Sequence, residues 1–214
     1  MLTRLAQNSL LAALLFLAPC VVLPAALTHP APWLAFVFAV TVLVSQPRLD
    51  FREPSDRGSA IAIVVAMILA PLVGVLEFVA SGAPHAGVAF ASGAVVAALG
   101  LLLRLWSIRT LGKFFTSAVR VVRGQTVVGS GPYRLLRHPS YTGALLIALG
   151  TALGFASAWS VALVLALCVP AYLFRIHVEE RELVSRLGAA YEQYRTRTWS
   201  LLPGLGGARH AART

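Results

Sequence analysis

The sequence predicts an all-α integral membrane protein: a polytopic bundle of about six transmembrane helices, with five as the alternative. Of its 214 residues, 58% are apolar and only 12% are charged, and the mean hydropathy is +0.78. A soluble domain carries about 25% charged residues and cannot bury so much apolar surface at this length. These values therefore exclude a soluble enzyme, and they equally exclude a disordered chain.

Six apolar stretches support this prediction, because a membrane span needs about 20 such residues. They cover residues 5–27, 32–45, 59–80, 87–106, 141–157 and 158–176. The second stretch is short, which leaves five spans possible. The fifth and sixth adjoin each other, so we expect a tight hairpin that turns near residues 156–160.

The basic residues all fall on one side of this map. Of the 18 Lys and Arg residues, one precedes the first stretch and three lie between the second and third. Seven lie at or after the end of the fourth stretch, and the other seven lie at or after the end of the sixth, from Arg175 to Arg213. This agrees with the positive-inside rule and predicts both termini in the cytoplasm. The net charge of +10 thus indicates orientation, and we expect no nucleic-acid partner.

Polarity is unevenly distributed along the chain. We expect residues 1–106 to be a scaffold of four spans. Residues 107–203 would form the working part, which comprises an interfacial segment, a helical hairpin and an amphipathic tail, and residues 204–214 a disordered tail. Lys113 is the only lysine, and this preference for arginine favours a GC-rich bacterial genome and hence a bacterial cell membrane. Both cysteines lie in apolar runs, so no metal site is predicted.

The first candidate cluster follows the interfacial segment, in the run Gly-Pro-Tyr-Arg-Leu-Leu-Arg-His-Pro-Ser-Tyr-Thr-Gly of residues 131–143. Gly131 allows a close backbone approach to a ligand. Arg137 and His138 together can bind an anionic group. Juxtamembrane Arg and Tyr also anchor helices at headgroups, but anchoring does not require a histidine bracketed by Arg137 and Pro139.

The second cluster ends the last apolar stretch. It contains Arg175, His177, Glu179, Glu180 and Glu182. Arg175 and Glu179 lie four residues apart and therefore share one helix face. Two adjacent carboxylates suit a cationic ligand group. The alternative is a solvated amphipathic helix that only lies along the membrane surface.

Together the two clusters resemble the isoprenylcysteine carboxyl methyltransferase and phospholipid methyltransferase group of membrane enzymes. The similarity covers about residues 100–203 and preserves both order and spacing. The matching motifs are Gly131-Pro132-Tyr133, Arg137-His138-Pro139-x-Tyr141-x-Gly143, Glu179-Glu180 and Gly188-x-x-Tyr191-x-x-Tyr194, ending in Leu202-Pro203. Two positions depart from the family pattern, Leu187 and Ser200, and both concern the substrate rim.

The resemblance implies a cytosolic S-adenosylmethionine site formed by the C-terminal half of the chain. Its cofactor-binding residues would be Gly131, Tyr133, Arg137, His138, Tyr141, Glu179 and Glu180. In the carboxyl-methylating branch of the family, two arginines hold the acceptor carboxylate. Their counterparts here are Arg104, eight residues before Gly112, and Arg175, thirteen residues before Gly188.

The acceptor implied by the resemblance is a lipophilic small molecule or a lipidated substrate that arrives from the membrane lipids. A carboxylate has a reference pKa near 4 and is already ionised, so its methylation requires clamps and no general base. An amine acceptor such as phosphatidylethanolamine is one alternative, but it would need a base. A membrane reductase that uses NADPH and a scaffold without enzymatic activity are the others.

Overall fold

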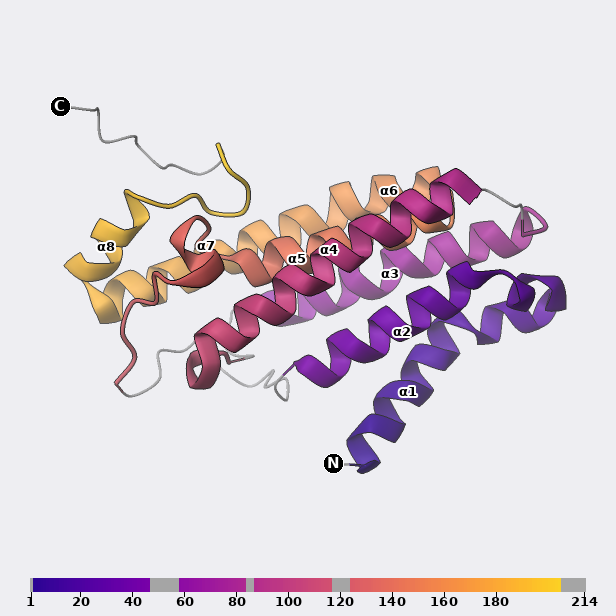
Figure 1. Cartoon of the computed structure of the whole chain (residues 1–214), viewed down its shortest axis with the longest axis horizontal. Helices are drawn as coiled ribbons and strands as arrows, with labels where there is room; N and C mark the ends of the chain where they lie inside the picture. Colours follow the sequence, from indigo (N-terminus) through magenta and orange to yellow (C-terminus); the bar gives the residue numbers. More distant parts are fainter. Residues whose placement is uncertain (1, 47–57, 84–86, 117–123, 205–214) are drawn as a thin grey trace.

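The computed structural model describes residues 2–46, 58–83, 87–116 and 124–204, which form an elongated helical bundle (Figure 1). The α-helices are α1 (Leu2–Phe16), α2 (Pro30–Ser45), α3 (Ser59–Ala80), α4 (Gly87–Leu111), α5 (Pro139–Gly154), α6 (Ala158–Leu163), α7 (Val169–Leu187) and α8 (Ala189–Arg195). A short 3-10 helix, η5 (Gly131–Arg134), precedes α5. The predicted disordered tail, residues 204–214, lies outside the described residues except for its first position.

The predicted fold class is confirmed, because the regular secondary structure of the described residues is helical apart from a single isolated β-bridge. Three helical stretches in this part of the chain are long and apolar enough to cross a membrane: Ser59–Ala80, Gly87–Phe114 and Ala158–Leu187. Shorter apolar helices cover Leu5–Phe16 and Pro30–Ser45. The number of spans stays a prediction.

The sequence predicts one span over residues 5–27, but this stretch does not form one continuous helix. Helix α1 ends at Phe16, and two 3-10 helices follow, η1 (Ala18–Val22) and η2 (Pro24–Thr28). Pro19 and Pro24 occupy the starts of these turns, and a proline lacks the N–H that α-helical hydrogen bonding requires. His29 then begins α2 by accepting a hydrogen bond at Nδ1 from the Ala31 N–H, at 3.2 Å.

The predicted hairpin forms where the sequence places it. Helix α5 ends at Gly154, and Ala156 adopts a left-handed conformation with φ +54°. The Ser157 hydroxyl then accepts a hydrogen bond from the Ser160 N–H at 2.9 Å and caps α6. A π-helical turn at Val164–Cys168 joins α6 to α7. We attribute this turn to Pro170, which cannot donate to the carbonyl four residues earlier.

Helices α4 and α5 approach each other most closely, because glycines face each other along their contact. A Cβ on Gly100 would lie 2.6 Å from the Gly143 carbonyl oxygen, and one on Gly93 would lie 2.4 Å from that of Gly150. Small residues at such contacts are the usual way in which membrane helices pack tightly. This contact holds Arg104 of α4 against the first turn of α5, where its Nη1 donates to the Ser140 carbonyl at 3.1 Å.

We expect Gly100→Ala to destabilise the protein by about 1–3 kcal/mol, because the added methyl group would force the two backbones apart. Thermal unfolding in detergent measures the effect. Gly87→Ala is the matched control on the same helix, since no atom of the described residues lies within 4 Å of a Cβ at that position. Equal melting temperatures for the two variants would contradict the close packing.

The C-terminal segment folds back onto the start of α5. Leu136 and Trp199 form a parallel bridge, and the Arg137 N–H donates to the Trp199 carbonyl at 2.8 Å. The Thr142 hydroxyl donates to the Leu201 carbonyl at 2.6 Å. These bonds fix residues 135–138 from two sides, so the segment that carries the first candidate cluster is part of the folded structure and not a surface loop.

Candidate active site

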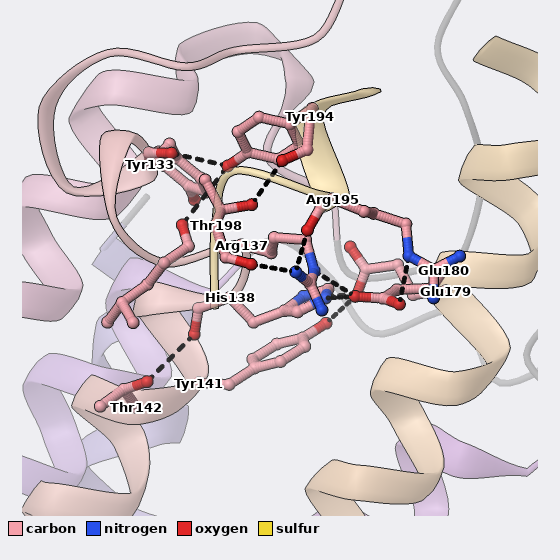
Figure 2. A network of polar contacts seen from close by, with 11 residues as sticks. Tyr133, Arg137, His138, Tyr141, Thr142, Glu179, Glu180, Tyr194, Arg195 and Thr198 are labelled. Atoms are coloured by element: carbon pink, nitrogen blue, oxygen red, sulfur yellow. Dashed lines mark hydrogen bonds and ion pairs between the residues drawn. The ribbon is translucent and has the colours of Figure 1, made fainter. Parts of the chain in front are cut away.

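The two clusters that the sequence singled out meet at one end of the bundle. Figure 2 shows the turn before α5 facing the middle of α7, with the side chains of both directed toward each other. Arg137 Nε donates to Glu180 Oε1 at 2.6 Å, and His138 Nε2 lies 3.3 Å from the same oxygen. The clusters are therefore in direct contact although about forty residues separate them.

Glu180 is the centre of a charge network. Its second oxygen, Oε2, lies 3.2 Å from Arg195 Nε, so one carboxylate contacts two guanidinium groups and one imidazole. The side chains of Arg137 and His138 are each only 4% exposed. Burying a charge is favourable only when it is paired and hydrogen-bonded, so Glu180 is what allows Arg137 to lie inside the structure.

Arg137 also connects the network to the folded-back C-terminal segment. Its Nη1 donates to the Arg195 carbonyl at 3.1 Å and to the Thr198 carbonyl at a shorter distance. The Tyr194 hydroxyl donates to the Tyr133 carbonyl at 2.7 Å. Burial raises the pKa of Tyr194 to about 12, so this phenol keeps its proton and stays a donor at any cellular pH.

Glu179 points to the other side of this network. It accepts a hydrogen bond at Oε2 from the Tyr141 hydroxyl at 2.6 Å, and His138 Nδ1 lies 3.8 Å from the same oxygen. Within the described part of the chain, no hydrogen bond or ion pair involves Oε1 of Glu179. The side chain is 30% exposed, so this oxygen is available to a cationic or hydroxyl group of a ligand.

A cleft lies beside Glu179. Its walls come from η5, the turn before α5, helix α7 and helix α8, together with the end of α4 and residues 114–116 and 125–128. The lining residues that the sequence predicted are Tyr133, Arg137, His138, Tyr141 and Glu179. Ser140, Glu182, Tyr191 and Tyr194 lie beside them. The cleft thus combines a carboxylate, a histidine and several aromatic rings.

A second, larger cavity of about 600 Å³ runs into the apolar part of the bundle. It is lined mainly by aliphatic side chains and phenylalanines of α1, α2, α3 and α5, such as Leu15, Phe38 and Met67. Arg104 and Arg175 line it as well, and so does Tyr141. Since Tyr141, Phe115 and Thr116 line both spaces, the apolar cavity and the cleft adjoin.

Arg104 is the least satisfied charged residue of the described structure. The residue is 1% exposed, and apart from the bond from Nη1 to the Ser140 carbonyl its donors are unpaired. Nε and Nη2 are buried and have no hydrogen-bond partner among the described residues. A buried guanidinium without an anion is costly, and each such group in a native structure requires an explanation.

The structure thus brings most of the predicted site residues together. Among the predicted cofactor-binding residues, Gly131 and Glu180 differ from the others, because neither lines the cleft. The two predicted clamp residues, Arg104 and Arg175, line the apolar cavity. Gly131 packs on α4, where a Cβ would lie 2.9 Å from the Thr110 hydroxyl and where φ is +54°. No signal in the sequence indicated Ser59, which lies at the start of α3 and accepts a hydrogen bond from Arg175 Nη1 at 3.0 Å.

The chain is similar in sequence to known proteins. A profile of the isoprenylcysteine carboxyl methyltransferase family matches residues 93–185. Protein-S-isoprenylcysteine O-methyltransferase B of Arabidopsis thaliana is 31% identical over 155 residues, which are 68% of this chain and 77% of the plant protein. Protein-S-isoprenylcysteine O-methyltransferase of Schizosaccharomyces pombe is 36% identical over 107 residues, 49% of this chain and 45% of the yeast protein.

A solved structure has a similar fold. It is that of the eukaryotic intramembrane Ras methyltransferase ICMT, with a TM-score of 0.61 and 22% sequence identity over 92% of this chain and 75% of the other. The apolar bundle, the polar site at one end of it and these relatives define an integral membrane methyltransferase. The chain belongs to the isoprenylcysteine carboxyl methyltransferase family.

Proposed function

We propose that this protein transfers a methyl group from S-adenosylmethionine to the carboxylate of a lipophilic acceptor. The observation that carries this proposal is the unpaired, buried guanidinium of Arg104 in the wall of an apolar cavity. An apolar ligand with a carboxylate end would give Nε and Nη2 the anionic partner that the protein itself does not supply. Arg175, which lines the same cavity, would bind the second side of that carboxylate.

The shape of the cavity suits a membrane-borne acceptor. A volume of about 600 Å³ lies within the range of roughly 300–1,000 Å³ that is usual for small-molecule sites. On α3 its lining runs from Ala60 to Pro71, which at about 1.5 Å per residue corresponds to a length of about 16 Å. An extended hydrocarbon or isoprenoid chain would occupy this space, with the carboxylate held at the arginines.

The cleft fits S-adenosylmethionine by the chemistry of its donors. Glu179 offers a free carboxylate oxygen to an amino group or to ribose hydroxyls. Tyr133, Tyr141 and Tyr191 provide aromatic surface for an adenine ring. Arg137 and His138 line the part that would receive the methionine carboxylate. Gly131 and Glu180 would contribute by shaping and bracing these walls.

When bound, S-adenosylmethionine would supply a methyl group on a sulfonium. A carboxylate oxygen of the acceptor would bond to the methyl carbon while the carbon–sulfur bond breaks. The electron pair of that bond would stay on sulfur, and no proton would move. The protein's own task is then positioning and the exclusion of water, which can contribute roughly 7–11 kcal/mol. Arg104 and Arg175 orient the carboxylate, and the ring of Tyr141 forms the boundary across which the two groups meet.

The relatives are named for S-isoprenylcysteine acceptors, and we propose a lipidated or isoprenoid carboxylate for this chain. The distribution of basic residues supports a cytoplasmic position for the site and for both termini. We place the protein in a bacterial cell membrane because of its arginine-rich composition. Residues 1–106 would form mainly the scaffold and acceptor cavity, and residues 107–203 the methyltransferase core.

Calorimetric titration of the purified protein in detergent tests the cofactor assignment. We expect S-adenosylhomocysteine, the unreactive product, to bind with a defined stoichiometry of one, and NADPH to give no saturable heat. Binding of NADPH together with no binding of S-adenosylhomocysteine would contradict the proposed function.

A further inference from the structure

Tyr141 lies at the boundary between the cleft and the apolar cavity and contributes to the walls of both. Its ring is stacked on His138, with centroids 5.5 Å apart and an interplanar angle of 2°. On another side, the ring centroid of Tyr172 lies 5.1 Å away. The ring is therefore held in place, and the direction of its hydroxyl is fixed.

The Tyr141 hydroxyl lies between the two charged groups that the proposed ligands require. It donates to Glu179 Oε2 at 2.6 Å and accepts a longer bond from Arg175 Nε at 3.4 Å. Arg175 Nη1 in turn donates to the Ser59 hydroxyl at 3.0 Å. A hydrogen-bonded chain thus runs from the carboxylate at the cleft, through Tyr141, to the guanidinium at the apolar cavity.

The position of the Tyr141 hydroxyl keeps two oppositely charged side chains of α7 apart. Arg175 and Glu179 lie four residues apart on one helix, where a basic and an acidic side chain normally pair with each other. Such a pair would neutralise the cation intended for the acceptor and the anion intended for the cofactor. The hydroxyl between them gives each group a hydrogen bond, and the two side chains line different spaces, Glu179 the cleft and Arg175 the apolar cavity.

We propose that the Tyr141 hydroxyl is a positioning group that couples the two sites, so that an anion at Arg175 and a cation at Glu179 strengthen each other's binding. This inference rests on the proposed function. An anionic acceptor holds Arg175 in the apolar cavity, which keeps the hydroxyl donating to Glu179 and the second carboxylate oxygen available to the cofactor. A methyl ester has no charge and cannot do so, which makes the coupling specific for the acid.

Binding measurements with unreactive ligands test this coupling without relying on turnover. Sinefungin, in which an amine replaces the sulfonium, is titrated into the protein with and without saturating farnesoic acid, and again with methyl farnesoate. For the unmodified protein we expect the acid to lower the sinefungin Kd at least about fivefold, the lower end of typical coupling between sites. The ester should leave the Kd unchanged within about twofold.

The coupling ratio is the sinefungin Kd without farnesoic acid divided by the Kd with it. Tyr141→Phe removes the hydroxyl and keeps the ring, so this ratio should fall to about one. Tyr172→Phe is the matched control, because the structure shows no hydrogen bond from that hydroxyl among the described residues, and the ratio should persist. Ser59→Ala loosens the other end of the chain and should also reduce the ratio, with the Kd for sinefungin alone within about twofold of the original.

Failure of the coupling and failure of the proposed function, on which it rests, give different results. If sinefungin and farnesoic acid each bind but Tyr141→Phe keeps the full ratio, or if acid and ester act alike, the coupling is refuted and the proposed function stands. If sinefungin does not bind to the unmodified protein, the cofactor assignment fails and the coupling fails with it.

Discussion

Arg104→Ala is expected to lower kcat/KM for the lipophilic acceptor at least about 30-fold. Removing one partner of a buried charge pair costs about 2–5 kcal/mol, and each 1.4 kcal/mol is a factor of ten. In the free protein Arg104 is buried with two unpaired donors, so its removal should not weaken the fold and should relieve a buried charge. The affinity for S-adenosylhomocysteine should stay within about threefold, since Arg104 does not line the cleft.

Steady-state kinetics with varied acceptor and product-binding calorimetry measure these two effects separately. Arg109→Ala is the control on the same helix, because Arg109 is exposed and lines neither space. Arg104→Lys should also remain impaired, since an ammonium group cannot bind a carboxylate through two parallel hydrogen bonds. Full turnover by the Arg104→Ala protein would remove the proposed acceptor clamp.

Glu180→Ala should have the second large effect, on both stability and cofactor binding. The substitution leaves Arg137 buried without its carboxylate and also releases Arg195. Breaking a buried pair in this way costs about 3–5 kcal/mol. Because Arg137 joins the turn before α5 to the carbonyls of Arg195 and Thr198, we expect the cleft to lose its shape and product affinity to fall more than tenfold.

Thermal unfolding and S-adenosylhomocysteine titration of the same preparation check this expectation. Glu192→Ala is the matched control, since Glu192 is an exposed acid on the neighbouring helix α8. Glu180→Gln keeps the size and an acceptor oxygen but no charge, and it should fall between the two. Unchanged melting temperature and unchanged product affinity in Glu180→Ala would show that the network is incidental.

The sequence alone predicted the bundle, because hydropathy and the one-sided distribution of arginines depend on local composition. The resemblance to the family placed both clusters at one cofactor site, but it assigned Arg137 and Glu180 to groups of the ligand. That these two side chains pair with each other was not predicted. The break at Pro19 and Pro24 was missed because an apolar run with prolines is compatible with either a kinked span or separate short turns.

Other features depend on tertiary contacts that no local pattern encodes. The bond between Ser59 and Arg175 joins residues 116 positions apart, and a single serine carries no motif. The unpaired state of Arg104 follows from the close contact of α4 with α5, which the glycine spacing permits but does not specify. The position of Tyr141 between two spaces likewise becomes evident only when α5 and α7 are packed together.

The most direct test of the central claim is the chemical nature of the methylated product. The purified protein is incubated with methyl-labelled S-adenosylmethionine and a lipophilic carboxylic acid such as farnesoic acid, and the lipid fraction is then treated with base. A methyl ester releases its label as volatile methanol, whereas a methylated amine or carbon keeps it. We expect base-labile label that depends on Arg104. Label that is stable to base, or formed equally by Arg104→Ala, would contradict methyl transfer to a carboxylate.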